Sequence, residues 1–174
     1  MLVDASTRRR STGRVGQMSS LDVVHFKQVV GHFATGVVVV ASATSAGPVG
    51  FTCQTFGSLS LEPMLVSFAA SNTGRSWPLV HEADFVGVSV LSEDQEAVAR
   101  IFATSGADKF RNVEVTNAPH GSPLLEGALA HLEGQILTVA THGDHDIVTV
   151  AVDYASAHAG KPLLYYRGGF GLLA

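Results

Sequence analysis

Residues 71–76 bring hydroxyls, an amide and a guanidinium together in the order Ser-Asn-Thr-Gly-Arg-Ser. An apolar run at residues 65–70 precedes them and predicts a strand that ends where these polar side chains begin. Ser, Asn and Thr are strong helix N-caps, and the free N–H groups of a helix N-terminus attract anions. Arg75 adds a planar cation that can hold a phosphate through two hydrogen bonds. The segment predicts a phosphate site or, more commonly for such a pattern, only a helix cap beside a solvated arginine.

A second group of small polar side chains ends the hairpin that comes before. Gly47 and Pro48 make a turn after the apolar run of residues 37–41, and the returning strand starts at Val49. That strand ends in the sequence Thr-Cys-Gln-Thr at residues 52–55. Its cysteine, Cys53, is typical of a small buried hydrophobe, since no neighbour in the sequence marks it as a nucleophile. The two polar segments together predict a cradle for a flat, phosphorylated ligand.

Two of the eight histidines, His142 and His145, flank Gly143-Asp144, which is a two-residue hairpin signal. Two histidines beside two carboxylates can bind a divalent metal, but a tight turn rarely points both rings of such a pair at one ion. A solvated turn is therefore the main interpretation, and a metal site is the alternative. Motifs for a Rossmann dinucleotide site, a P-loop, a zinc protease and a serine hydrolase do not occur in the sequence.

The composition limits the class of protein. The chain has 174 residues, enough for one domain with a full core, and a net charge of −4, which is no footprint for nucleic acid. Its apolar runs are well short of the ~20 residues that a membrane helix needs. Apolar residues make up 46% and charged residues 15% of the chain, so we expect some apolar surface to meet a partner subunit. A single cysteine leaves no internal disulfide and fits a reducing cytoplasm.

The first residues differ in composition from the rest. Residues 1–18 are rich in Arg, Ser, Thr and Gly, and lack an apolar stretch of signal-peptide length. We interpret them as a disordered tail ahead of a domain at residues 19–174. Met18 is an alternative translation start.

Hydrophobic spacing predicts the elements that position these polar groups. Apolar residues from Val23 to Phe33 recur at helical spacing, predicting a helix capped by Ser19 or Ser20 and ended at Gly36. The unbroken run at 37–41 predicts a strand buried on both faces. A short helix at Trp77 follows, and a capping box (Ser92 with Gln95 three residues later) starts another. Further strands are expected at residues 85–91, 128–141, 147–152 and 162–166, and a loop or lid at 107–121.

These six or seven strands, with turns between them and no regular βαβ alternation, predict a mainly β fold. A closed or nearly closed antiparallel barrel with two or three peripheral helices is the natural architecture.

The chain also carries an ordered set of motifs: FATGVVVV, PVGFTCQTFGSLSLEP, SNTGRSW, DFVGVSVL, DKF, GDH and LLYYRGGF. Each is weak alone, but in this order the set resembles the short-chain flavin reductases, the reductase components of two-component flavin monooxygenases such as 4-hydroxyphenylacetate 3-monooxygenase. The likeness covers about residues 21–172. It implies an FMN-binding split β-barrel with Greek-key topology, usually a homodimer. It further implies that NADH, with NADPH possible, reduces FMN or FAD, and that reduced flavin diffuses to a partner oxygenase.

The resemblance also assigns residues to the two cofactors. The isoalloxazine ring and ribityl chain are expected to lie, largely on backbone groups, along Thr52, Cys53, Gln54 and Thr55. The phosphate is expected on Ser71, Arg75 and Ser76, and Phe102 corresponds to an aromatic near the flavin. The nicotinamide is expected to stack on the ring beside His145, Tyr166 and Arg167, with His145 orienting it.

Two related readings remain open at this point. The same barrel could hold flavin as a non-catalytic electron carrier or sensor, although that role has no use for a nicotinamide site. The second alternative is an enzyme barrel of the pyridoxamine-phosphate oxidase type. The longer basic motif with which that type binds phosphate does not occur in the chain.

Overall fold

The computed structural model describes residues 21–106 and 108–173. The predicted tail at 1–18, and Ser19 and Ser20, lie outside the described residues. Within the described part, seven antiparallel strands form the main sheet in the order β3-β2-β6-β9-β10-β5-β4. Their bounds are Val38–Thr44 (β2), Gly47–Cys53 (β3), Gly57–Leu61 (β4), Met64–Ser71 (β5), Phe85–Val90 (β6), Ala130–His142 (β9) and His145–Ala157 (β10).

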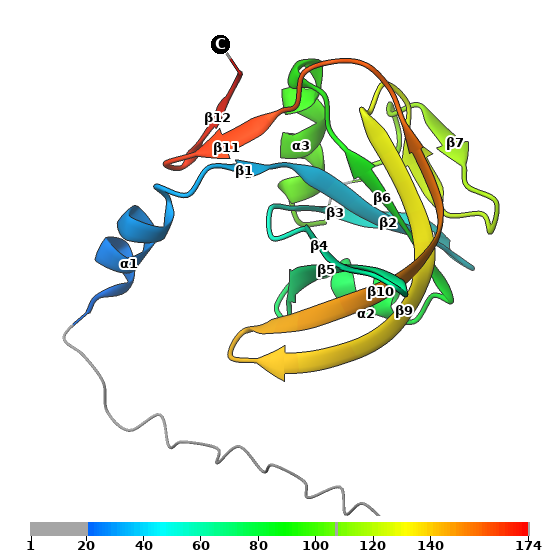
Figure 1. Cartoon of the computed structure of the whole chain (residues 1–174), viewed down its shortest axis with the longest axis horizontal. Helices are drawn as coiled ribbons and strands as arrows, with labels where there is room; N and C mark the ends of the chain where they lie inside the picture. The colour runs from blue at the N-terminus through cyan, green and yellow to red at the C-terminus, as the bar shows by residue number, and fades with distance from the viewer. Residues whose placement is uncertain (1–20, 107, 174) are drawn as a thin grey trace, which may run out of the picture.

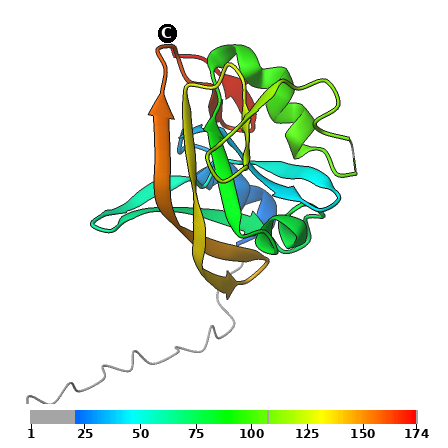
Figure 2. The ribbon, with the colours of Figure 1, turned by 90° about the vertical axis from the view of Figure 1, so that its right-hand side faces the viewer.

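The sheet curls around a core, so that its first strand approaches the strands at its other end (Figures 1 and 2). The side chain of Thr55, just after β3, accepts a hydrogen bond from the Ala69 N–H of β5 at 2.8 Å and donates one to its carbonyl at 3.2 Å. The Thr55 side chain therefore links the end of β3 to β5, although these two strands are not paired through backbone hydrogen bonds. This confirms the predicted fold class, a mainly β antiparallel split barrel with peripheral helices.

Strand β2 is buried on both faces, as its unbroken valine run predicted. Val38 and Val40 belong to the core inside the barrel, together with Phe68 and Trp77. Val37 and Val39 belong instead to a second core on the outer face. There the helix α3 (Glu96–Ala103) covers the sheet through Ala99 and Phe102. The second core fixes α3 against the barrel wall, next to the end of β3.

The longest hairpin joins β9 and β10 through the predicted Gly143-Asp144 turn, where Gly143 takes a φ of 66°. Strand β9 nearly matches the predicted 128–141, whereas β10 runs beyond the predicted 147–152 at both ends and continues to Ala157. Two register shifts bend the pair around the barrel. At Gly134 a Cβ atom would lie 2.0 Å from the Ala151 carbonyl oxygen, so only glycine fits this close approach.

The predicted N-terminal helix is shorter than expected. Helix α1 spans Val23–Val30, and Asp22 caps it by accepting a hydrogen bond from the His25 N–H at 2.9 Å. The cap of the described helix is thus Asp22, whereas Ser19 and Ser20 lie outside the described residues, and the predicted end at Gly36 is wrong. Asp22 caps the helix because it lies three residues before the free N–H group of His25, the spacing that an N-cap side chain needs. The helix ends at Gly31. The chain then enters the short strand β1 (Thr35–Gly36), which pairs with β11 (Leu164–Tyr166).

Several short elements complete the described chain. Strand β12 (Gly169–Gly171) pairs antiparallel with β11. The predicted 107–121 loop holds the strand β7 (Val115–Asn117), which pairs with β8 (Pro123–Leu125). The capping box of Ser92 and Gln95 is present and opens a single 3-10 turn, Glu93–Gln95, ahead of α3. The predicted short helix at Trp77 is α2 (Trp77–His81). No described helix has the length and apolar content to cross a membrane.

Candidate active site

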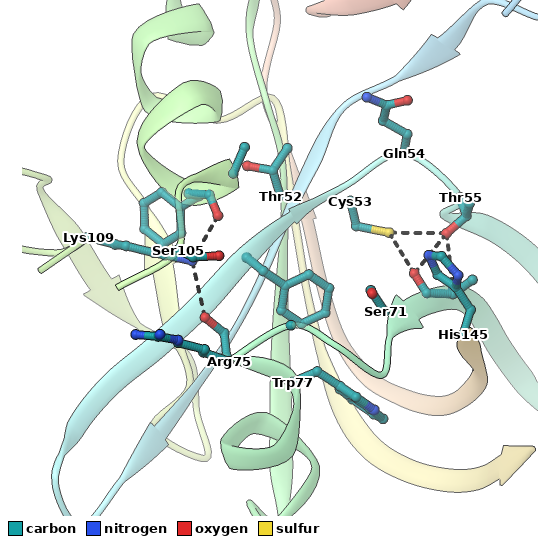
Figure 3. A pocket seen from close by; sticks show the side chains of 16 residues that line it. Thr52, Cys53, Gln54, Thr55, Ser71, Arg75, Trp77, Ser105, Lys109 and His145 are labelled. Carbon is teal, nitrogen blue, oxygen red and sulfur yellow. Dashed lines mark hydrogen bonds between the residues drawn. The ribbon is translucent and has the colours of Figure 1, made fainter. Parts of the chain in front are cut away.

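A cavity of about 320 Å³ lies where the end of β3, the loop between β5 and α2, and the C-terminal end of α3 meet (Figure 3). Sites for small ligands are typically this size or larger. Nine predicted site residues line it: Thr52, Cys53, Gln54, Thr55, Ser71, Arg75, Ser76, Phe102 and His145. Segments far apart in the sequence thus form one wall.

Strand β3 delivers its last residues to the cavity with their side chains already held. Thr52 donates a hydrogen bond to the Ala99 carbonyl of α3 at 2.6 Å, and the Cys53 thiol lies 3.2 Å from the Thr55 hydroxyl. Cys53 is buried, and burial raises the pKa of its thiol above the ordinary value of 9.0, against an opposing hydrogen bond with Thr55. The thiol is therefore kept neutral and unreactive at neutral pH.

Arg75 and Ser76 lie at one end of the cavity, where Ser76 holds the N-cap position of α2. Helix α2 is only five residues long, and the Ser76 side chain makes no capping hydrogen bond, so the predicted side-chain cap is wrong for Ser76, while the anion site at this helix start stays a prediction. The Ser76 hydroxyl instead accepts a hydrogen bond from the Lys109 ammonium at 3.1 Å. Within the described residues no carboxylate pairs with Arg75. An anion at this end would meet a guanidinium and a hydroxyl.

Lys109 is the residue that sequence reasoning missed. It follows α3 on the predicted loop, lines the cavity, and lies half-buried against neutral acceptors. Burial lowers the pKa of its ammonium from the ordinary 10.5. The only signal for it was the Asp-Lys-Phe motif at residues 108–110, because the acceptors that it binds are distant in the sequence.

His145 lies at the other end of the cavity, at the start of β10. Its partner in the sheet register is Ser71, so Ser71 belongs to this end and not to that of Arg75. The His145 Nδ1 lies 2.8 Å from a carboxylate oxygen of Asp144, which also lowers the pKa of Asp144 below 3.8. Nε2 has no hydrogen-bond partner in the described part of the chain. The bond to Asp144 holds the ring and leaves Nε2 for a ligand.

Phe102 also lines the cavity, and its carbonyl accepts a hydrogen bond from Lys109 on the side of Arg75. It is fully buried in α3, and its ring meets that of Phe110 edge-on, with centroids 4.9 Å apart. Trp77, which starts α2, also lines the cavity. Aromatic rings therefore supply the flat, apolar part of the wall.

Tyr166 and Arg167 are not brought into this cavity. Arg167 lines a separate surface hollow beside α1, with Lys27 and His32 among its neighbours. Its backbone N–H donates to the Gly31 carbonyl at 2.9 Å, and its φ of 49° turns the chain back from β11 to β12. Another cavity, of about 400 Å³, shares Thr52, Gln54 and Ala103 with the first one, and includes Tyr165 and Phe170.

The hairpin histidines do not assemble a metal site in the described part of the chain. His142 and His145 face each other in the register of β9 and β10, but the group of three ligand atoms within 4.8 Å of one another is His120, Glu133 and Asp153, elsewhere. There the buried Glu133 carboxylate accepts the backbone N–H groups of His120 and Ser122, both at 2.8 Å. That carboxylate anchors a turn.

Comparison with known proteins agrees with this geometry. The family model described as "Flavin reductase like domain" matches residues 30–174. The chain belongs to this flavin reductase-like family. The reductase subunit of a flavin-dependent monooxygenase from Rhodococcus jostii is 38% identical over 152 residues, covering 87% of this chain and 78% of that protein.

Other relatives in the family carry related names. An NADH-dependent FMN reductase from Agrobacterium fabrum is 34% identical, covering 84% of this chain and 83% of its own. Among solved structures, a Streptomyces globisporus NADH:FAD oxidoreductase in complex with NAD and FAD fragments superposes with a TM-score of 0.84. It is 35% identical and covers 88% of this chain and 93% of its own.

Proposed function

We propose that the chain is an NAD(P)H-dependent flavin reductase, which takes hydride from NADH onto FMN or FAD and supplies reduced flavin to a separate oxygenase. The observation that carries this is one cavity that brings together Arg75 and Ser76 at one end, aromatic side chains in its wall, and a histidine at the far end. The names of the relatives support both cofactors and the oxygenase partner.

The residues present fit a flavin nucleotide. The unpaired Arg75 guanidinium and the Ser76 hydroxyl suit the phosphate, and residues 52–55 offer a backbone edge for the ring and the ribityl chain. Ser71, by its place in the sheet, serves the ring end. When bound together, the nicotinamide and the flavin supply the hydride chemistry themselves.

The protein's contribution is therefore to bind and orient. His145, held by Asp144, is placed to hydrogen-bond the nicotinamide carboxamide through Nε2. Phe102 and Trp77 exclude water from the ring face. No side chain needs to act as a strong acid or base, because hydride transfer moves no protein proton.

The working unit is a homodimer built through α1. Helix α1 buries none of its residues in its own chain, and Figure 1 shows it apart from the barrel. Its Val24 is 68% exposed and Phe26 51%, and Phe33, just beyond it, is 78% exposed. An apolar face of this kind is normally covered by another subunit. Since Arg167 binds the end of α1, Tyr166 and Arg167 would lie at that boundary, and reach a nicotinamide only in the partner's cavity.

The dimer is tested by charging that face. The double variant Phe26→Asp, Val30→Asp is expected to sediment as a monomer near 18.2 kDa, while the wild-type chain sediments at twice that mass. Ile101→Asp is the matched control, because Ile101 is a half-exposed residue of α3 on the barrel. A wild-type chain that sediments as a monomer at every concentration contradicts the dimer.

A cytoplasmic location is part of the proposal, because Cys53 is a free thiol and NADH is a cytoplasmic reductant.

The function is tested by following NADH oxidation by dialysed protein with and without added FMN, FAD or riboflavin. Oxidation is expected only with added flavin, and to saturate with it. Tightly bound flavin that survives dialysis and is reduced once would favour the electron-carrier alternative instead.

A further inference from the structure

Lys109 makes three hydrogen bonds within the protein. Its Nζ donates to the Phe102 carbonyl at 2.9 Å, to the Gly50 carbonyl at 3.0 Å and to the Ser76 hydroxyl at 3.1 Å. A lysine ammonium has three N–H donors, so all of them are used. The cation therefore cannot bond a ligand without releasing one of these partners, although it lines the cavity.

The three acceptors belong to three separate elements. Gly50 lies in β3, two residues before Thr52 of the cavity wall, and Phe102 lies in the last turn of α3. Carbonyls in the last turn of a helix lack partners within the helix. The Arg100 carbonyl is satisfied by the Thr104 hydroxyl at 3.0 Å, and that of Phe102 by Lys109. The ammonium ties the end of α3 to β3 and to the residue that precedes α2.

The bond to Ser76 sets the direction of that hydroxyl. A hydroxyl that accepts from an ammonium must turn its own hydrogen away from the cation. In the described part of the chain the Ser76 hydroxyl has no acceptor for that hydrogen. Since Ser76 faces the cavity beside Arg75, the hydrogen is left for a ligand oxygen.

We propose that Lys109 is a positioning residue for the flavin phosphate: it holds the Ser76 hydroxyl as a donor to the phosphate and does not bind the phosphate itself. The inference rests on the proposed function, which supplies the phosphate. The three hydrogen bonds to neutral protein acceptors support this role, because a lysine that bound a phosphate directly would keep a donor free for it. The depressed pKa of its buried ammonium agrees with that neutral environment.

The test is a double-variant cycle read out by flavin fluorescence quenching. Dissociation constants for FMN and for riboflavin, which lacks the phosphate, are measured for the wild type, Lys109→Met, Ser76→Ala and the double variant. Each single variant is expected to weaken FMN about 10-fold, the effect of one hydrogen bond to a charged group. The double variant is expected to be no weaker than Ser76→Ala, and riboflavin binding to change less than about 2-fold, because only the phosphate is affected.

Lys109→Arg keeps the positive charge but changes the hydrogen-bond geometry, so it tests which of the two matters. It also gives a second measurement if Lys109→Met folds poorly. A planar guanidinium cannot serve three acceptors arranged around a point, so this variant is expected to lose FMN affinity as Lys109→Met does. Lys161→Met, an exposed lysine beyond the cavity, is the control and is expected to bind FMN as the wild type does.

Three results overturn the inference. These are additive losses in the double variant, an equal loss for riboflavin, or wild-type FMN affinity in Lys109→Arg. If the wild-type chain reduces FMN but the losses are additive, only the role of Lys109 fails. If the wild-type chain neither binds nor reduces flavin, the proposed function fails and the inference fails with it.

Discussion

The two ends of the cavity differ in what they leave unpaired. At the end of Arg75, cations gather and the described chain pairs no carboxylate with them, while the Ser76 hydroxyl keeps its hydrogen free (Figure 3). At the end of His145, the polar side chains hold one another: Cys53 contacts Thr55, and Asp144 holds the imidazole. The first end can attract an anion, while the second can orient a neutral ring.

This difference indicates that the binding of the two cofactors can be altered independently. A flavin phosphate gains from charge and free donors, whereas a nicotinamide needs an oriented hydrogen-bonding partner and a flat surface. Changes at one end should therefore alter the affinity for one cofactor and spare the other. Two variants test that separation, and a third tests the hydrogen bonds that join the two ends.

The largest effect is expected at the charged end. Arg75→Ala removes a bidentate charge-assisted contact, and we expect the dissociation constant for FMN to rise about 100-fold, the upper part of what such a bond contributes. Fluorescence titration measures it, with Arg111→Ala, an exposed arginine beyond the cavity, as the control. If Arg75→Ala raised the KM for NADH and left FMN binding intact, the two ends would be assigned the wrong way round.

His145→Ala tests the other end. We expect kcat/KM for NADH to fall about 10- to 100-fold, as when one positioning contact is lost, and FMN affinity to change much less. His142→Ala is the matched control, since it lies opposite His145 on the hairpin but does not line the cavity. A loss of flavin binding with an unchanged KM for NADH would contradict the assignment.

The smallest effect concerns the link between the two ends, where the Trp77 indole and the Thr141 hydroxyl donate to the Asp146 carboxylate at 2.8 and 2.7 Å. These bonds hold the pKa of Asp146 below its ordinary 3.8. Because the folded state favours the charged form, this group stabilises the fold above pH 3.8, and that stability is lost as the pH falls through the lowered pKa.

Asp146→Asn should therefore lower the urea midpoint at neutral pH, and the difference from wild type should shrink in acid. Asp84→Asn, which changes an exposed carboxylate, is the control and should leave the midpoint unchanged. A difference that grows as the pH falls would show that the carboxylate does not stabilise the fold in its charged form.

Local patterns predicted the elements well, because their causes are local. The valine run before Gly47 predicted a strand buried on both faces, and Gly143-Asp144 predicted the hairpin tip, both confirmed. The N-terminal helix was predicted too long, since helical spacing continues past Gly31 although the chain leaves the helix there to pair with β11.

The site was predicted as a set of residues but not as an arrangement. Ser71 and Arg75 are four residues apart, yet the register of β5 and β10 places Ser71 opposite His145. Lys109 was missed because its three acceptors come from Gly50, Ser76 and Phe102, which only the fold brings together. Tyr166 and Arg167 lie outside the cavity of their own chain, because the turn after β11 directs them toward α1.

Catalytic turnover of free flavin is the central claim, and one anaerobic experiment tests it directly. A large molar excess of FMN or FAD over protein is mixed with NADH, and loss of the flavin's visible absorbance is followed to completion. We expect all of the flavin to be reduced, with many flavins per protein and one NADH consumed for each. Reduction that stops at a single equivalent of flavin per protein, or that does not occur, would contradict the account.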